Sequence, residues 1–285
     1  MKLIVMGDLH YHEFDETVAG LQASHEAYYG KLMERFFEQD ADLHISLGDL
    51  TNFGTERELR EIYGLIGRWT GRADRRFVHV LGNHDLYAQP RADVLAQTGQ
   101  PRYSRVETDL AMLAFLDTAR DQDLLDWGGW IDDEQLDWLE ETVVASGDKP
   151  LLVFGHHPVY ATTARSEGDM GSIHRQVDMW RALGRKQGIG LYFNGHTHVD
   201  SIASRDNWTF VQLAACLDVP SFRVVEIGPE SIEVSAAEAL DEEIVSGSAA
   251  ICAHMHHFRQ TPGARGEQGD REIRIALKDG ASLTG

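Results

Sequence analysis

The sequence predicts an α/β protein, because short apolar segments alternate with segments of helical periodicity. The apolar segments are three to seven residues long, and many of them end at Gly followed by a polar residue. Their length and their β-branched or aromatic content are typical of buried strands. They cover residues 3–6, 43–47, 77–81, 110–116, 151–154, 191–193 and 210–213.

Helical patterns lie between several of these strands. Residues 25–39 repeat apolar side chains at helical spacing, and the Thr55 to Glu58 segment has the form of a capping box that opens a helix through Trp69. Further helices are expected after Asp132 and after Ser172. Strands that alternate with helices favour a sheet whose faces the helices cover.

The pattern of predicted elements and the composition change in the last third of the chain. Residues 223–227 and 231–235 predict an antiparallel hairpin that completes a sheet, with no helix between them. Beyond residue 236, Ala, Gly and charged residues dominate, with one expected strand at 272–277. The sequence therefore predicts a catalytic domain over residues 1–235 and a small C-terminal appendage over 236–285, which serves as a lid or as an oligomer contact.

The composition restricts the partners of the protein. The 285 residues carry a formal net charge of −20, which disfavours general nucleic-acid binding and adhesion to anionic membranes. Cys216 and Cys252 are too few for a disulfide framework, and we expect them to stay reduced. Because no apolar run reaches membrane-spanning length and the N-terminus enters a strand pattern at once, we expect a cytoplasmic protein.

Polar clusters follow five of the expected strands directly. Since ligands of open α/β sheets bind at the carboxyl ends of strands, these clusters are expected to converge on one point. Carboxylate and imidazole donors without thiolates suit Mn, Fe or Zn. The clusters are Asp8-Leu9-His10, Gly48-Asp49, Gly82-Asn83-His84-Asp85, Gly155-His156-His157-Pro158 and Gly195-His196-Thr197-His198.

In these five blocks the sequence resembles the calcineurin-like metallophosphoesterase superfamily, and the resemblance covers residues 1–235. It implies a four-layer α/β/β/α sandwich of two packed mixed β-sheets with helices outside. It also implies two divalent metal ions. Among its branches, the short Asp8 to His10 start and the His156-His157-Pro158 block are most similar to the bacterial cyclic-nucleotide phosphodiesterases and glycerophosphodiesterases. Asn52 stands where purple acid phosphatases carry a ligating Tyr.

The resemblance also implies a role for each motif residue. One metal is expected on Asp8, His10 and His198, the other on Asn83, His156 and His196, with Asp49 bridging both. His84 would contact the substrate phosphate or protonate the leaving group. Asp85 would orient His84. His157 could replace or assist His156, although Pro158 favours His156 as the ligand.

The implied activity is hydrolysis of a small organic phosphodiester, of cyclic-nucleotide or glycerophosphodiester type, by a metal-bound hydroxide. Two divalent cations, two aspartates and one hydroxide leave a single positive charge, which balances a diester. A phosphomonoesterase that uses the same centre is the alternative, and Arg165 or Arg102 could supply the charge that it needs. A non-catalytic scaffold is the third hypothesis. Loss of metal-ligand residues would indicate it, but a ligand residue is present at every expected position.

Other histidines and aromatic residues are expected to have structural roles. His44 and His79 are predicted to pack inside strands, and His12 and His25 to lie at the surface. Trp127 lies in an insertion that could touch the substrate. The C-terminal His254, His256 and His257 form either an exposed loop or a lid that reaches into the substrate pocket, in this subunit or in a neighbouring one.

Overall fold

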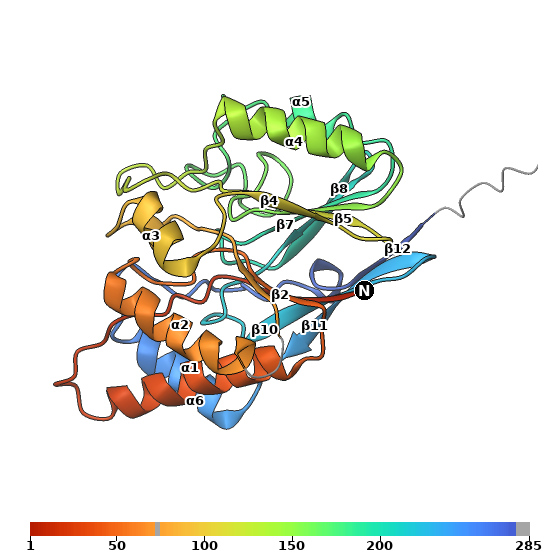
Figure 1. Cartoon of the computed structure of the whole chain (residues 1–285). Helices are drawn as coiled ribbons and strands as arrows, with labels where there is room; N and C mark the ends of the chain where they lie inside the picture. Colours follow the sequence, from red (N-terminus) through yellow and green to blue (C-terminus); the bar gives the residue numbers. More distant parts are fainter. Residues whose placement is uncertain (72–74, 278–285) are drawn as a thin grey trace, which may run out of the picture.

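The computed structural model describes residues 1–71 and 75–277 as a four-layer sandwich. Two six-stranded sheets pack face to face, and helices cover the outer face of each sheet (Figure 1). Helices α1, α2 and α6 lie outside the first sheet, whereas α4 and α5 lie outside the second (Figure 1). The architecture predicted from the sequence is therefore confirmed.

The first sheet has the strand order β12-β11-β10-β1-β2-β3. Strands β1, β2 and β3 are parallel, and the others are antiparallel to their neighbours. The expected hairpin is formed by β10 and β11. The strands are β1 (Lys2–Met6), β2 (Leu43–Ser46), β3 (Phe77–His79), β10 (Ser221–Ile227), β11 (Ser231–Glu238) and β12 (Ile273–Ala276).

The second sheet has the order β4-β5-β6-β7-β9-β8. Its four central strands are parallel, and the edge strands β4 and β8 are antiparallel to their neighbours. The strands are β4 (Ser104–Glu107), β5 (Met112–Phe115), β6 (Leu151–Phe154), β7 (Gly190–Asn194), β8 (Ser201–Arg205) and β9 (Trp208–Gln212).

The helices include the four that the sequence predicts. Thr55 forms the expected capping box with Glu58 at the start of α2, and Asp132 caps α4. The α-helices are α1 (Leu21–Glu38), α2 (Glu56–Thr70), α3 (Arg91–Thr98), α4 (Asp133–Ser146), α5 (Met179–Leu183) and α6 (Glu242–Cys252), and the 3-10 turns are η1 (His84–Leu86) and η2 (Gln268–Asp270).

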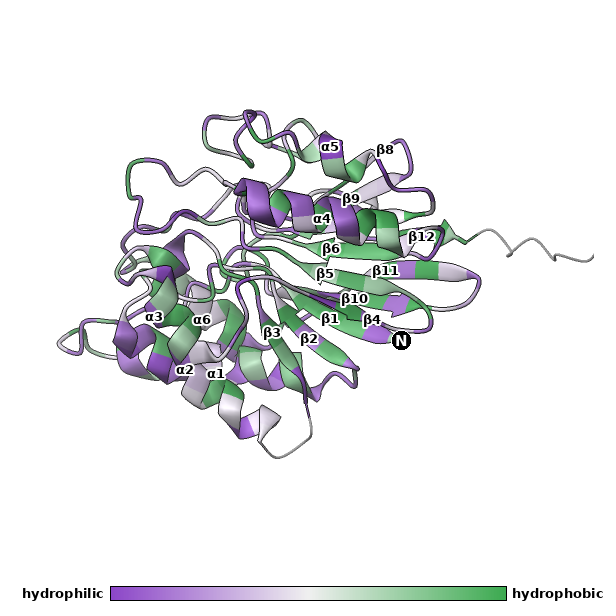
Figure 2. Cartoon of the chain, turned by 45° about the horizontal axis from the view of Figure 1, so that its top comes forward, coloured by the Kyte–Doolittle hydropathy of each residue, from purple (hydrophilic) through white to green (hydrophobic). Residues whose placement is uncertain are grey.

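Side-chain alternation along the strands creates the layers. Leu3 and Val5 of β1 join the core between the two sheets, whereas Ile4 and Met6 join the core under α1, α2 and α6. Successive strand residues point to opposite faces, so each central strand buries apolar side chains on both sides. Figure 2 shows mostly apolar strands in the sheets and helices that carry both hydrophilic and hydrophobic residues.

Four elements lie outside the sequence prediction. Strands β4 and β8 are edge strands with several polar or exposed residues, α3 buries only Val94 among its residues, and α6 is rich in small side chains. Helix α5 begins at Met179, capped by Asp178, rather than directly after Ser172. Weakly apolar elements escape a search based on hydrophobic periodicity.

The C-terminal segment is built into the first sheet and its helical layer. Strand β11 runs across residue 236, and β12 pairs with β11 as the edge strand. Helix α6 packs on α1, where a Cβ on Gly247 would lie 2.9 Å from the Cβ of Tyr28. The role of the C-terminal appendage as an oligomer contact stays a prediction. Cys216 and Cys252 are both free thiols. Within residues 1–71 and 75–277, no helix is long and apolar enough to span a bilayer.

Candidate metal centre

The carboxyl ends of parallel strands bring the predicted ligands together. Asp8 and Asp49 follow β1 and β2 in the first sheet, while His156 and His196 follow β6 and β7 in the second. The ends of parallel strands meet at one edge of a sheet, and face-to-face packing brings the two edges together. The centre therefore lies between the sheets.

Four of the ligand residues adopt left-handed backbone conformations. The φ angles are 51° at His10, 47° at Asp49, 72° at His196 and 56° at His198. This region is costly for residues with a Cβ, and it occurs where surrounding structure enforces a functional geometry. The loops turn sharply after each strand, and these turns direct the side chains to a common point.

Two glycines of the motifs allow close packing around the aspartates. A Cβ on Gly82 would overlap the Asp49 carboxylate, and a Cβ on Gly195 would overlap the Asp8 carboxylate. Gly82 and Gly195 are therefore required by the space that the two carboxylates occupy.

The first donor set consists of Asp8, His10, Asp49 and His198, whose ligand atoms lie within 4.8 Å of one another. His10 Nε2 is 3.1 Å from His198 Nε2, and His198 Nε2 is 3.2 Å from Asp8 Oδ2. His10 Nε2 is 3.9 Å from Asp49 Oδ2. The structure thus brings together the residues predicted for the first metal, with Asp49 beside them.

The second donor set centres on the amide oxygen of Asn83. His156 Nε2 lies 3.0 Å and His196 Nδ1 lies 3.1 Å from Asn83 Oδ1. The Asn83 amide nitrogen donates to the Tyr87 hydroxyl at 2.6 Å, which orients the oxygen toward the histidines. His156 Nε2 is also 3.3 Å from Asp49 Oδ2, so Asp49 borders both sets.

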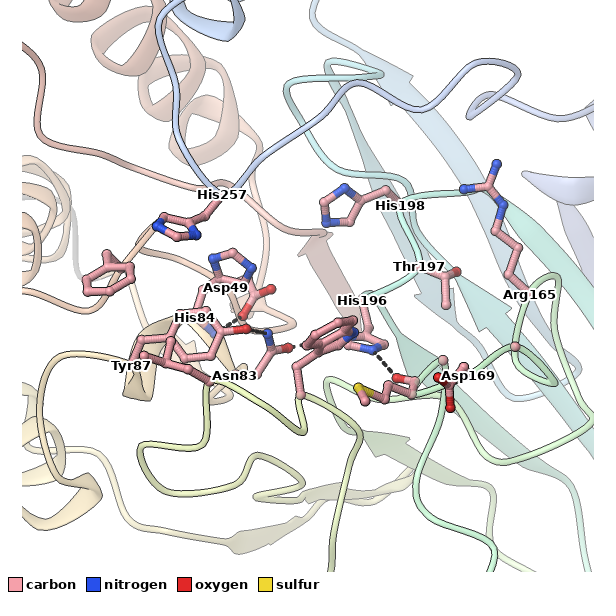
Figure 3. Close-up of a pocket in the computed structure, with 16 residues that line it drawn as sticks. Asp49, Asn83, His84, Tyr87, Arg165, Asp169, His196, Thr197, His198 and His257 are labelled. Atoms are coloured by element: carbon pink, nitrogen blue, oxygen red, sulfur yellow. Dashed lines mark hydrogen bonds between the residues drawn. The ribbon is translucent and has the colours of Figure 1, made fainter.

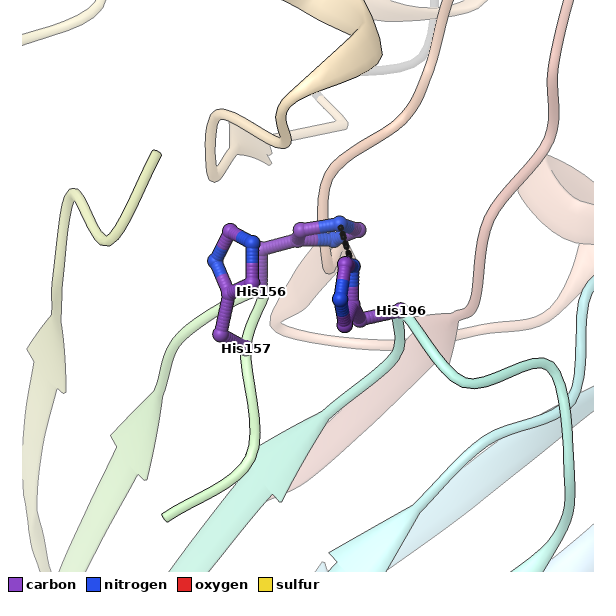
Figure 4. Close-up of side chains that lie close together, drawn as sticks. All are labelled: His156, His157 and His196. Carbon is purple, nitrogen blue, oxygen red and sulfur yellow. Dashed lines mark hydrogen bonds between the residues drawn. The ribbon is translucent and has the colours of Figure 1, made fainter. Parts of the chain in front are cut away.

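His157 lies beside this second set, and its ring stands next to those of His156 and His196 (Figure 4). Both of its ring nitrogens have other partners: Nδ1 contacts Thr118 Oγ1 at 2.8 Å, and Nε2 contacts the Trp127 carbonyl oxygen at 2.9 Å. His156 Nε2 faces Asn83 and Asp49 instead. The geometry thus favours His156 as the ligand and His157 as a wall of the site.

The buried donors fit divalent cations. Within residues 1–71 and 75–277, Asp8 Oδ1 and His10 Nδ1 have no hydrogen-bond partner. Burial would raise the pKa of Asp49, but the imidazoles of His156 and His84 hold it well below its usual range. Burial lowers the pKa of His156, but the Asp49 carboxylate outweighs burial and raises this pKa to about 9. A site that concentrates carboxylate, imidazole and amide oxygen donors has the ligand chemistry of Mn, Fe or Zn.

His84 is held at the edge of the centre by two hydrogen bonds. Its backbone N–H donates to Asp49 Oδ1 at 2.8 Å, and its Nδ1 donates to the carbonyl oxygen of Asn52 at 2.6 Å. A carbonyl only accepts, so Nδ1 carries a proton. The second ring nitrogen, Nε2, is therefore left for a substrate in the pocket that His84 lines.

The structure corrects the role expected for Asp85. Its oxygens accept hydrogen bonds from Thr51, Gly82 and His79, the last at 3.1 Å between Nε2 and Oδ2. The partner that orients His84 is the Asn52 carbonyl instead. Asp85 links the loops at Thr51 and Gly82 to His79 of β3.

The family model described as calcineurin-like phosphoesterase matches residues 1–200. The chain belongs to this family. The match ends two residues after His198, so it spans all five motif blocks of this calcineurin-like phosphoesterase.

Two relatives agree with this assignment, and one solved structure shares the fold. The chain is 24% identical over 207 residues to a probable cyclic nucleotide phosphodiesterase of Rhodopseudomonas palustris, covering 70% of this chain and 72% of that protein. It is 28% identical over 123 residues to a glycerophosphodiester phosphodiesterase of Enterobacter lignolyticus, covering 41% and 42%. A dimetal phosphatase from Danio rerio shares the fold, with a TM-score of 0.67 at 15% identity over 84% of this chain and 96% of that chain.

A pocket of about 790 Å³ opens beside the centre of this calcineurin-like phosphoesterase. His84, Tyr87 and His257 lie at one end, and Arg165 and Asp169 lie at the other (Figure 3). Trp127 also lines the pocket, as the sequence suggested, and it is 44% exposed. Arg102 instead pairs with Asp117 and Asp132.

Sequence reasoning missed several residues that support the site. Tyr29 of α1 donates its hydroxyl proton to the carbonyl oxygen of His10 at 2.6 Å. His12 and His25, expected at the surface, are buried beside Tyr29, because α1 closes over the loop that follows β1. Such backbone-directed contacts have no signature in the sequence. His44 and His79 are buried as expected.

Proposed function

We propose that the protein is a metal-dependent phosphodiesterase that hydrolyses a small organic phosphodiester, of cyclic-nucleotide or glycerophosphodiester type. The observation that carries the proposal is the pair of donor sets that share Asp49 and border one pocket together with His84. A cytoplasmic location and a small-molecule partner are parts of the same proposal. The names of the two relatives, both phosphodiesterases, support it.

The positions of the side chains suggest which residues bind the metals and which acts on the substrate. Two divalent cations bound there supply Lewis acidity and lower the pKa of coordinated water toward neutrality. Asp8, His10 and His198 would hold one cation, and Asn83, His156 and His196 the other, with Asp49 between them. His84 lines the pocket, and with both ring nitrogens protonated it would donate the Nε2 proton to the leaving oxygen, a contribution of about 10²–10⁴-fold.

The charge around the pocket supports a diester as the preferred substrate. Two cations, Asp8, Asp49 and one hydroxide leave one net positive charge, which matches the single negative charge of a diester. One further cation, Arg165, lines the pocket on the side away from His84 (Figure 3). This guanidinium favours the second candidate, a phosphomonoesterase, because a monoester carries more charge.

The two candidates are separated by two chromogenic esters. Wild-type protein loaded with Mn²⁺, Fe²⁺ or Zn²⁺ is assayed on bis-p-nitrophenyl phosphate and on p-nitrophenyl phosphate. A higher kcat/KM on the diester is expected, and the reverse ranking refutes the diester assignment. A panel of cyclic nucleotides, glycerophosphodiesters and phosphomonoesters then identifies the substrate group.

Substitution of the centre tests the mechanism. Asp49→Ala and Asn83→Ala are each expected to lower hydrolysis by several orders of magnitude and to weaken metal binding measured by calorimetry. Arg105→Ala, at an exposed position of β4 in the second sheet, is the control and should retain activity. Full activity of the metal-stripped protein or of the Asp49 variant would mean that hydrolysis does not use this centre.

A further inference from the structure

The C-terminal segment 253–265 forms one side of the metal centre. Met255 and Phe258 are its buried anchors, with 9% and 6% exposure. The Phe258 ring stacks on His198 at 5.2 Å between ring centroids and meets His10 edge-on at 4.9 Å. Both contacts are to residues of the first donor set. The segment is therefore in direct contact with the proposed ligands, although it lies outside the residues that the family model matches.

Hydrogen bonds hold this segment along its length. Asn52 donates its amide proton to the carbonyl oxygen of His256 at 2.8 Å, while its own carbonyl holds His84. Further along, the Thr261 backbone N–H donates to Asp218 Oδ1 at 2.7 Å. Anchors before and after His257 thus fix its position, and its φ angle of 62° lies in the left-handed region. Such a conformation persists only where neighbouring contacts enforce it.

His257 is directed at the pocket rather than at the core. Its side chain is exposed and lines the pocket, on the same side as His84 and Tyr87 (Figure 3). Its ring lies 5.1 Å from the Phe53 ring, with an angle of 32° between the planes. Phe53 in turn lies 5.8 Å from Tyr87, and Tyr87 lies 4.7 Å from His84. A continuous aromatic surface thus runs from His257 to His84.

We propose that Phe53, Tyr87 and His257 form a subsite for a planar aromatic group of the phosphate ester, with His257 as a specificity-determining residue. The proposal rests on the proposed function, because it places the leaving group beside His84. Rings at these separations present their faces and edges to a further ring, which prefers offset or edge-to-face packing. Of the two proposed substrate types, a cyclic nucleotide carries such a ring in its base, whereas the glycerol group of a glycerophosphodiester does not.

Hydrolysis by four proteins tests the subsite. Wild type, His257→Ala, His257→Phe and the control His254→Ala are assayed with Mn²⁺ on bis-p-nitrophenyl phosphate and on glycerophosphocholine. His254 is exposed and does not line the pocket. We expect His257→Ala to raise KM for the aromatic diester about three- to tenfold, the range for one aromatic pair. His257→Phe and His254→Ala should retain the wild-type KM, and no variant should change the KM for glycerophosphocholine.

Binding separates a failure of the subsite from a failure of the proposed function. Calorimetry with phenylphosphonate and ethylphosphonate, both on the Mn²⁺-loaded protein, requires no turnover. We expect wild type and His257→Phe to bind phenylphosphonate about three- to tenfold more tightly than ethylphosphonate, and His257→Ala to lose this preference. Equal binding of the two ligands by wild type, or binding of neither, overturns the subsite. A preference without hydrolysis of any ester overturns the proposed function and leaves the subsite in place.

A general structural effect of the substitution gives a different pattern. Loss of affinity for both phosphonates in His257→Ala, together with weaker Mn²⁺ binding, would assign His257 to the framework of the metal centre. A loss in His257→Phe equal to that in His257→Ala would assign the effect to the imidazole nitrogens. Either outcome contradicts recognition of an aromatic ring.

Discussion

Replacing His44 by Phe should remove part of the acid sensitivity of the fold. His44 lies in β2 with no exposed surface, and its ring packs 5.1 Å from Phe36 and 4.9 Å from Phe37. Its Nε2 contacts the Gln39 carbonyl oxygen at 3.2 Å, and its Nδ1 has no partner within the described parts of the chain. Burial, reinforced by the nearby charge of Arg75, lowers the pKa of His44 to about 4.

The sign and size of the effect follow from this pKa. An imidazole titrates near 6.5 in the unfolded chain, so the folded state binds its proton more weakly. The stability that neutral His44 contributes is complete above pH 6.5 and is lost as the pH falls toward 4. With about 1.4 kcal/mol for each pH unit between the two pKa values, the loss reaches about 2 kcal/mol at pH 5 and about 3 kcal/mol at pH 4.

Urea unfolding at pH 7.5, 6 and 5 in the presence of a chelator measures this term. The wild-type free energy of unfolding should fall by about 2 kcal/mol more than that of His44→Phe between pH 7.5 and pH 5. His174→Gln, at an exposed histidine, should follow the wild type. Parallel pH profiles for wild type and His44→Phe would refute the assignment of acid sensitivity to this buried ring.

Three other predictions follow from the site. Arg165→Gln should lower kcat/KM on p-nitrophenyl phosphate more than on bis-p-nitrophenyl phosphate, because the guanidinium lines the pocket and a monoester carries more charge; an equal loss on both esters argues against this role. Asp85→Ala should lower the free energy of unfolding at pH 7 by about 3 kcal/mol, since it leaves the buried N–H groups of Thr51 and Gly82 without their acceptor. Urea unfolding measures this, and a change below about 1 kcal/mol contradicts it. Tyr29→Phe leaves the buried carbonyl of His10 without its hydrogen bond, so thermal unfolding should show a free energy of unfolding lower by about 1–3 kcal/mol. Calorimetry should show weaker Mn²⁺ binding, and unchanged values for both measurements exclude the support inferred for Tyr29.

The proposed ligand sets could be predicted from the sequence because each depends on local features. Asp8, Asp49 and His196 each follow a strongly apolar strand within a few residues, and the ends of parallel strands meet without further information. The positions of these residues in the structure match that expectation. Their role as metal ligands is the part that calorimetry and substitution test.

Other features depend on distant contacts that the sequence does not encode locally. The family resemblance implied that Asp85 orients His84, yet a backbone carbonyl at Asn52 takes that place. Any residue type supplies a carbonyl, so no side-chain pattern marks it. Helix α6 was missed for a related reason: Gly247 and its small neighbours permit close packing on α1 rather than forming an apolar stripe.

Asn52 also links the order of synthesis to the completion of the site. Its carbonyl holds His84, while its amide holds the backbone at His256, which is made more than two hundred residues later. The five motif blocks are complete once residue 198 has been translated. A nascent chain at that stage carries every proposed ligand, but it lacks β9 and β10, which pair with β7 and β1, and it lacks Phe258, which covers His10 and His198. The proposed ligands are therefore held in place only after the later strands have been made, and the pocket is closed only after the segment around His256 has followed.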